Sequence, residues 1–159
     1  MTRQTITLDI AAPPEAVWPA LVDPDAVARW RTPDDMTATI HHFDAREGGT
    51  FRISLTYLAP DASGKTAAQT DTYHGRFLSL VPGRSVTEEI AFETDDPALQ
   101  GRMTLTTGLT RSAKGTLVAM TFDNLPPGID PALNEAGTRQ SLEKLAQLVG
   151  PANNPRTIL

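Results

Sequence analysis

The stretch FDAREGGTFRI, residues 43–53, decides the fold of this chain of 159 residues. Phe43, Phe51 and Ile53 have the character of strand residues that face a core. An arginine, a glutamate and two adjacent glycines nevertheless separate the first of them from the other two. This pattern indicates the end of one strand, a turn and the start of the next strand.

Gly48 and Gly49 predict that turn, because adjacent glycines adopt positive φ without steric cost. The turn joins strands predicted at residues 36–43 and 50–58, and the second of these alternates cleanly between apolar and polar residues. A β-bulge near Arg46 would let this side chain swing across the edge of the sheet. We expect Arg46 to brace the hairpin through carbonyls or a carboxylate.

A second hairpin is predicted from residues 72–81 and 85–93, because the Pro-Gly pair between them suits a type II turn. Closing this turn with Val81 opposite Arg84 fixes the register of the two strands. In that register an arginine opposes a glutamate on the outer face, and this pairing supports the alignment. The inward-facing pairs are Phe77 with Glu88, Gly75 with Ile90, and Tyr73 with Phe92.

A third hairpin joins residues 102–110 to 116–124 through the sequence SAKG, and Arg111 pairs with Thr116. With this register fixed, the next pairs along the ladder are Leu109 with Val118, Thr107 with Met120, and Leu105 with Phe122. A first strand at residues 4–10, which also alternates between apolar and polar residues, completes the set of seven predicted strands.

Three helices are predicted. The first has apolar residues at helical spacing, but Pro19 removes a hydrogen bond, so this helix either begins as late as Ala16 or is kinked. A short second helix follows at residues 24–30. The third runs from its N-cap Asp130 to Val149. One face of this long helix carries Thr138, Leu142, Leu145 and Val149.

The composition is that of a globular protein, with 40% hydrophobic and 21% charged residues. We expect residues 1–150 to fold as one domain and residues 151–159 to form a flexible tail. A net charge of −5 and scattered basic residues argue against a nucleic acid or a membrane as partner. The chain has no cysteine, no signal-peptide core and no apolar segment of transmembrane length, so a cytoplasmic location is expected.

The order of elements resembles the α+β helix-grip fold of the START-like (SRPBCC) superfamily, in which a curved antiparallel sheet wraps a long C-terminal helix. Three stretches carry a closer resemblance: IAAPPEAVWPALVDPDAVARW, REGGTFRI and EAGTRQSLEKLAQLV. They are similar to the N-terminal signature, the Arg-x-Gly-Gly hairpin and the closing helix of proteins similar to the C-terminal domain of the Hsp90 ATPase activator. The resemblance covers roughly residues 4–150.

Two features depart from that family's pattern. Its closing helix usually carries Gly-Trp where this chain has Gly137 and Thr138, so an indole is missing from the side that faces the sheet. Its absence leaves either a larger cavity or a compensating substitution elsewhere. The small and polar stretch at residues 59–71 is predicted to be a mobile loop, longer than the turn common in relatives.

The resemblance implies an apolar cavity between the sheet and the closing helix. A sheet that curves around one helix leaves space at its wider end, and pockets commonly form there. Simple core packing accounts for most of the inward-facing residues, and a subset is expected to line the cavity. The predicted pocket comprises Trp30, Phe51, Ile53, Tyr57, Tyr73, Phe77, Glu88, Ile90, Met103, Leu105, Met120, Phe122, Thr138 and Leu142.

Glu88 is the candidate with the most distinctive chemistry. In the predicted register its carboxylate faces inward, where it must be paired, hydrated or poised to donate a proton. A structural hydrogen bond to Tyr57 or Tyr73 is favoured over catalysis. A register slip of one residue would instead turn Glu88 to solvent and Glu89 to the interior.

Neither a metal centre nor a cofactor is predicted. His41 and His42 are adjacent in a strand, so we expect them on opposite faces and unable to chelate one metal, and His74 falls on the outer face. The serines lack the setting of a catalytic nucleophile. Neither the Gly-Gly pair nor the Pro-Gly-Arg sequence resembles a loop that binds phosphate.

The resemblance, taken with these residues, implies three possible functions. The leading hypothesis is a non-enzymatic domain that binds a small hydrophobic or amphipathic molecule between the sheet and the long helix. The alternative is an enzyme of the polyketide cyclase or aromatase type, which would use Glu88 with Tyr57 or Tyr73 as acid or base. An interaction module for the Hsp90 chaperone is disfavoured, because the chain lacks the activator's N-terminal domain. The resemblance also allows a homodimer, which no sequence feature specifies.

Overall fold

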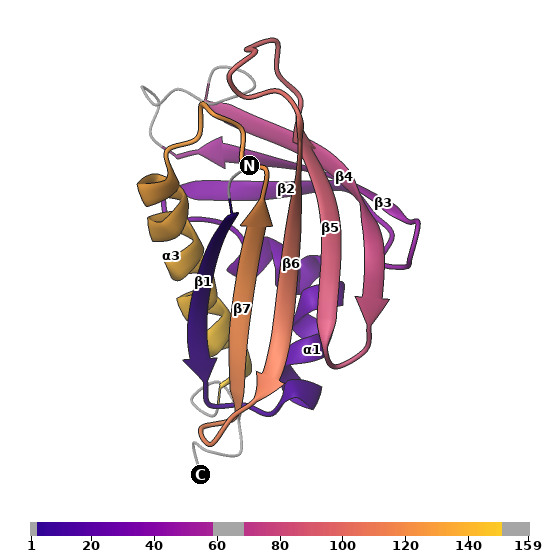
Figure 1. The fold of residues 1–159 in the computed structure, drawn as a ribbon, viewed down its shortest axis with the longest axis vertical. Coiled ribbons are helices and arrows are strands. Elements are labelled where there is room, and N and C mark those ends of the chain that lie inside the picture. The colour runs from indigo at the N-terminus through magenta and orange to yellow at the C-terminus, as the bar shows by residue number, and fades with distance from the viewer. Residues whose placement is uncertain (1–2, 59–68, 151–159) are drawn as a thin grey trace.

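The computed structural model describes residues 3–58 and 69–150. Within these residues, seven antiparallel strands form one sheet in the order β1-β7-β6-β5-β4-β3-β2, and three helices accompany it (Figure 1). This arrangement confirms the helix-grip α+β architecture. The elements are β1 (Arg3–Ile10), α1 (Pro14–Val22), α2 (Pro24–Trp30), β2 (Met36–Phe43), β3 (Thr50–Tyr57), β4 (Thr70–Val81), β5 (Ser85–Phe92), β6 (Arg102–Arg111), β7 (Thr116–Asp123) and α3 (Pro131–Val149).

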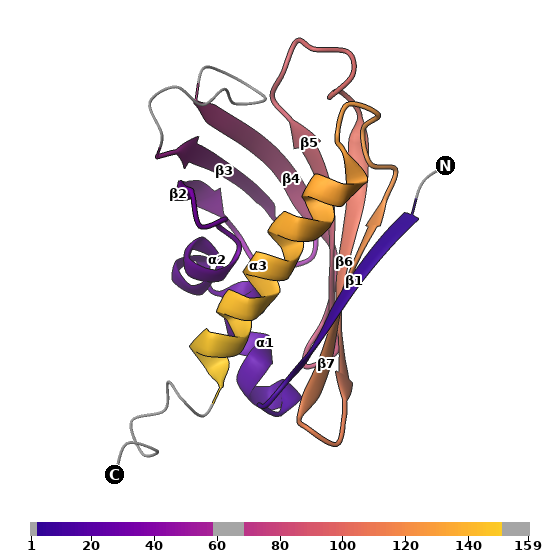
Figure 2. The same cartoon turned by 90° about the vertical axis from the view of Figure 1, so that its left-hand side faces the viewer.

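Helix α3 crosses the concave side of the curved sheet, with β1, β6 and β7 on one side of it and β2 to β4 on the other (Figure 2). It packs most closely on β1, α1 and α2. The carboxylate of Asp130 caps it by accepting from the N–H of Ala132 at 2.9 Å, as predicted. No helix in the described part of the chain is long and apolar enough to cross a membrane.

The turn between β2 and β3 uses its two glycines for different reasons. Gly48 has the predicted positive φ, +81°, but Gly49 does not. A Cβ at Gly49 would instead lie 2.0 Å from the carbonyl oxygen of Asp44, so that position needs glycine for space. The Gly49 carbonyl accepts from the N–H of Phe77 at 2.9 Å, which ties the turn to β4. Arg46 braces the hairpin as expected, with Nε donating to Asp44 Oδ2 at 2.7 Å.

The β-bulge of this hairpin lies at His41, and its predicted position near Arg46 is wrong. The pairing of β2 with β3 shifts between Ile40 and His42. Residues three positions apart in a regular strand face opposite sides of the sheet. The extra residue of the bulge lets Ile40 and Phe43 both face the core. Without it, the alternation of the strand would turn one of the two to solvent.

The register of the second hairpin is as predicted at its centre and differs at its turn. Its inward-facing pairs are Phe77 with Glu88, Gly75 with Ile90, and Tyr73 with Phe92. The ladder closes with Val81 opposite Ser85, however, and not opposite Arg84. A one-residue shift just before Ser79 absorbs the difference. The side chain of Glu88 therefore faces inward even though the turn is longer than predicted.

The third hairpin contains all the predicted pairs: Arg111 with Thr116, Leu109 with Val118, Thr107 with Met120, and Leu105 with Phe122. The start of β4 differs from the prediction, because Thr70 and Asp71 belong to this strand and not to a loop at 59–71. The rest of that predicted loop, residues 59–68, and the predicted tail, residues 151–159, lie outside the described residues.

Of the two alternatives for helix α1, a late start or a kink at Pro19, the late start is wrong. The helix begins at Pro14 and not at Ala16, because a proline at the first helical position sacrifices no intrahelical hydrogen bond. Pro19 lies inside the helix and removes one such bond. Burial of Val17 and Leu21 against the core offsets this loss.

Gly49→Ala is expected to destabilise the protein by about 2–3 kcal/mol, because the added Cβ meets backbone that has no room to yield. Gly48→Ala is expected to cost about 1 kcal/mol, since no atom lies near the added Cβ and only the positive φ is unfavourable. Urea unfolding of both variants measures the difference. A Gly49→Ala protein as stable as the wild type would contradict this explanation of the turn.

Candidate functional site

A cavity of about 540 Å³ lies between α3 and the inner face of the sheet. Its lining side chains come from β2 to β7, from α3 and from the segments that precede β2 and α3. This volume falls within the range typical of small-molecule sites. Apolar side chains form most of the wall: Met36, Leu55, Ile90, Phe92, Met103, Leu105, Met120, Phe122, Ile129 and Leu133.

The structure divides the predicted pocket residues into two groups. Those that line the cavity are Tyr57, Tyr73, Ile90, Met103, Leu105, Met120, Phe122 and Thr138. Those that do not line it, although all are buried, are Trp30, Phe51, Ile53, Phe77, Glu88 and Leu142. Phe51 and Phe77 instead pack on each other with ring centroids 5.2 Å apart, and Phe43 lies 5.4 Å from Phe77. This aromatic cluster fills the interior beside the Gly-Gly turn.

The side of α3 that faces the cavity carries small residues. Gly137 and Thr138 both line it, where the family resemblance led us to expect Gly-Trp. A Cβ at Gly137 would meet no atom within 4 Å. A small side chain therefore stands at position 138, and the cavity extends to this part of α3.

Glu88 faces the interior, but its partner is Arg31, and the expected hydrogen bond to a tyrosine is wrong. Arg31 Nη1 donates to both carboxylate oxygens of Glu88, at 2.9 and 3.2 Å. The two side chains are 14% and 4% exposed, respectively. A buried carboxylate without a partner would be strongly destabilising, and this ion pair provides the compensation.

Arg31 is held at the cavity wall by the end of α2. Its backbone N–H donates to the carbonyl of Val27 at 2.9 Å, so the residue continues the hydrogen bonding of that helix. The neighbouring Trp30 anchors the helix end, because its indole N–H donates to the carbonyl of Ala20 at 2.8 Å. The guanidinium also lies 6.0 Å from the centroid of the Trp30 ring.

Sequence reasoning missed Arg31. A basic residue at the end of a helix is ordinarily a solvent-exposed residue that interacts favourably with the helix dipole, so nothing marked this one as buried. The one available signal was indirect: an inward-facing Glu88 requires a cationic or hydrogen-bonding partner. Asp71 was missed as well. It is 2% exposed and lines the cavity, but it belonged to the residues assigned to a loop.

Both Arg31 and Tyr73 stay protonated at neutral pH. Burial acts to lower the pKa of the Arg31 guanidinium, but the charge of Glu88, the Tyr73 phenol and the hydrogen bonds to Glu88 outweigh it, and this pKa is raised. Burial also raises the pKa of the Tyr73 hydroxyl. The positive charge of Arg31 acts to lower this pKa, and the negative charge of Glu88 acts to raise it further. Two hydrogen-bond donors therefore stand in the wall of the cavity.

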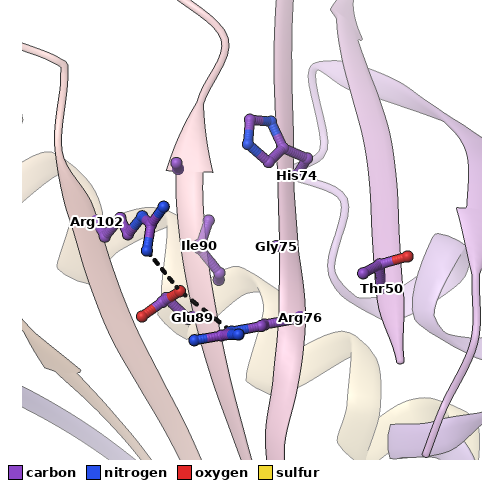
Figure 3. Close-up of a pocket in the computed structure, with 8 residues that line it drawn as sticks. Thr50, His74, Gly75, Arg76, Glu89, Ile90 and Arg102 are labelled. Atoms are coloured by element: carbon purple, nitrogen blue, oxygen red, sulfur yellow. Dashed lines mark hydrogen bonds and ion pairs between the residues drawn. The ribbon is translucent and has the colours of Figure 1, made fainter. Parts of the chain in front are cut away.

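A second hollow, of about 220 Å³, lies on the outer face of the sheet (Figure 3). There Glu89 bridges Arg76 and Arg102, with each N–O distance 3.4 Å. The cross-strand pairing of Arg76 with Glu89 is as predicted. Because these arginines are exposed and the hollow is small, the inner cavity is the stronger candidate for a binding site.

The histidines lie on the outer face as well. His41 Nε2 is 2.8 Å from the hydroxyl of Ser54, and His42 pairs with Arg52 across the ladder. The expectation that they occupy opposite faces is wrong, because the bulge at His41 disturbs the alternation of the strand. His74 also lies outside, as expected, 3.0 Å from a carboxylate oxygen of Glu93. Among the described residues, no three histidine or acidic side chains gather as metal ligands would.

The model of the family described as Activator of Hsp90 ATPase homolog 1-like protein matches residues 11–150. The chain belongs to this family. Protein CV1439 from Chromobacterium violaceum is similar to it in structure, with a TM-score of 0.83, 32% identity and coverage of 94% of this chain and 97% of that one. No curated protein matches the chain.

Other structural relatives are more distant in sequence and support the fold alone. A protein of Rhodobacter sphaeroides has a TM-score of 0.76 at 21% identity, over 92% of this chain and 91% of that one. The AHSA1-like protein from Aeromonas hydrophila has a TM-score of 0.68 at 24% identity, over 93% of this chain and 92% of that one.

Removing one partner of the buried pair is expected to cost roughly 3–5 kcal/mol, because the other charge then stays buried without compensation. Arg31→Met and Glu88→Leu should each show this loss in urea unfolding. The double variant, which buries no charge, should be more stable than either single variant. If the two single losses simply add in the double variant, the pair is not coupled as described.

Glu93 should contribute to stability above pH 4.5 and lose that contribution as the pH falls. The hydrogen bonds from Arg52, at 2.8 and 2.9 Å, lower the pKa of Glu93 from 4.5 to about 2, with burial opposing and His74 assisting. A carboxyl group with a depressed folded pKa stabilises the native state while it is ionised. Glu93→Gln should therefore lose less stability than the wild type between pH 4.5 and about pH 2.

Urea midpoints measured across this pH interval test the expectation. Glu143→Gln, at an exposed position of α3, is the matched control and should follow the wild type. Parallel pH profiles for the wild type and Glu93→Gln would show that the ion pair with Arg52 contributes nothing to stability.

Proposed function

We propose that this chain binds a small hydrophobic or amphipathic molecule in the cavity between α3 and the sheet. The observation that supports this proposal is the cavity itself, about 540 Å³ with a mostly apolar wall. A ligand that removes this wall and its own apolar surface from water gains about 25 cal/mol per Å² of buried area. A few polar groups in the same wall would orient the molecule.

The cavity reaches the surface at the first turn of α3. Leu133 lines the cavity and its side chain is nevertheless 71% exposed. An apolar residue at this place gives a hydrophobic ligand a favourable contact on the way in. The family and its fold are compatible with such a site, but a fold by itself does not assign a function, so the cavity carries the argument.

The geometry does not favour the enzymatic alternative. Both oxygens of Glu88 accept hydrogen bonds from Arg31, and Glu88 is absent from the described lining of the cavity. A general acid or base has to reach the proton that it transfers. Tyr57 and Tyr73 do line the cavity, but among the described residues neither hydroxyl is hydrogen-bonded to a base. We therefore propose binding without catalysis.

Thr138→Trp is expected to fill the cavity and to weaken the binding of a ten-carbon probe, methyl octyl ketone, at least tenfold. Thr138 lines the cavity, so an indole at this position would extend into the space that the ligand is proposed to occupy. Calorimetric titration measures the affinity, and thermal unfolding confirms that the variant is folded. The control is Arg139→Trp, which places the same ring at an exposed position of α3 and should bind as the wild type does. Undiminished binding by Thr138→Trp would place the ligand elsewhere.

A further inference from the structure

Among the described residues that line the cavity, Arg31 is the one basic side chain. We propose that Arg31 and Tyr73 together donate hydrogen bonds to an uncharged oxygen acceptor, a carbonyl or a hydroxyl, on the ligand of this cavity. The inference rests on the proposed function and adds the chemistry of the ligand's head group. It follows from the unused donors, from the charge balance and from the position of Arg31 along α3.

The first observation is that Arg31 and Tyr73 have hydrogen-bond donors that no described residue accepts. The hydrogen bonds from Arg31 to Glu88 use Nη1 alone, and Nε and Nη2 have no hydrogen-bond partner among the described residues. The hydroxyl of Tyr73 has none in that part of the chain either. No fully enclosed side-chain nitrogen or oxygen of the described residues lacks a partner. The unused donors are therefore accessible, and because both residues line the cavity, it is the space they can reach.

The second observation is the charge balance. Glu88 neutralises Arg31, and further carboxylates line the same cavity: Asp35, Asp71 and Asp130. An anionic head group would bring another negative charge into this wall, and a buried charge without its own counter-charge is costly. An ammonium group carries only donors, so it cannot accept a hydrogen bond from Arg31 or Tyr73. A carbonyl or hydroxyl oxygen uses the free N–H groups and adds no charge.

The third observation is the position of Arg31 relative to the mouth of the cavity. The segment that follows Arg31 lies against the middle of α3, where the Asp34 N–H donates to Gln140 Oε1 at 3.3 Å. Leu133, at the mouth, lies seven residues earlier in the helix, which corresponds to about 10 Å along its axis. A ligand with its oxygen at Arg31 can therefore extend an apolar chain toward Leu133 along the apolar wall, which includes Met120 and Phe122.

Three probes with the same chain length and different head groups test this inference on the wild-type protein: methyl octyl ketone, decanoate and decylamine. Calorimetry at neutral pH should show the ketone binding at least tenfold more tightly than either charged probe. Similar affinities for all three probes, or tighter binding of decanoate, would overturn the head-group assignment and leave the proposed function intact. If none of the three binds, both the assignment and the proposed function are wrong.

Variants of the ion pair provide the second test. The double variant R31Q/E88Q removes both charges and should weaken ketone binding roughly tenfold, because its neutral amides replace a charged donor. Glu88→Gln alone leaves the cation of Arg31 unbalanced, so decanoate should gain affinity relative to the ketone. An unchanged ratio of the two affinities in Glu88→Gln would contradict the charge argument.

The matched control is R102Q/E89Q, which removes the same kinds of charges from the outer face of the sheet (Figure 3). This variant should bind all three probes as the wild type does. Circular dichroism establishes that each variant is folded. If Glu88→Gln does not fold, the probe comparison on the wild type and the double variant still decide the question.

Discussion

The buried ion pair between Arg31 and Glu88 is the interaction on which the arrangement of the interior depends. Glu88 stands on β5, the central strand of the sheet, and Arg31 stands at the end of α2. Two charges removed from water are tolerated only where their geometry is good, so the end of α2 has to lie where the guanidinium reaches the carboxylate. The pair thereby joins the helices to the middle of the sheet.

The space that remains follows from this constraint and from the curvature of the sheet. Helix α3 packs on β1, α1 and α2, while the strands beyond curve away from it (Figure 2). Aromatic rings close the interior at the Gly-Gly turn, with Phe51 and Phe77 in contact. Toward the start of α3, Gly137 and Thr138 are too small to fill the gap. Protein interiors are usually close-packed, and an opening of this size is the basis of the proposed binding site.

Much of this fold could be predicted from local patterns, because alternation and turn residues act over short distances. They placed the strands and helices and the inward direction of Glu88. They could not reveal the one-residue bulges at His41 and before Ser79, since a bulge changes the register without a distinctive residue. Arg31 lies 57 residues from Glu88 in sequence, and no periodic signal connects positions so far apart.

Residues that line a cavity also look the same in sequence as residues that fill a core. Phe51 and Tyr73 both face inward from neighbouring strands, and their rings lie 6.3 Å apart. Only Tyr73 lines the cavity. Phe51 lies on the side of the Gly-Gly turn, where aromatic rings fill the interior, and Tyr73 lies on the side where the interior is open. Only the curvature of the sheet and the placement of α3 distinguish them, and both are properties of the assembled fold.

The most direct test of this account is a crystal structure of the protein grown with methyl octyl ketone. The account predicts electron density for the ketone between α3 and the sheet, with its oxygen within hydrogen-bonding distance of the Arg31 guanidinium and its chain directed toward Leu133. An interior filled by side chains from α3, with no space for a ligand, would contradict it.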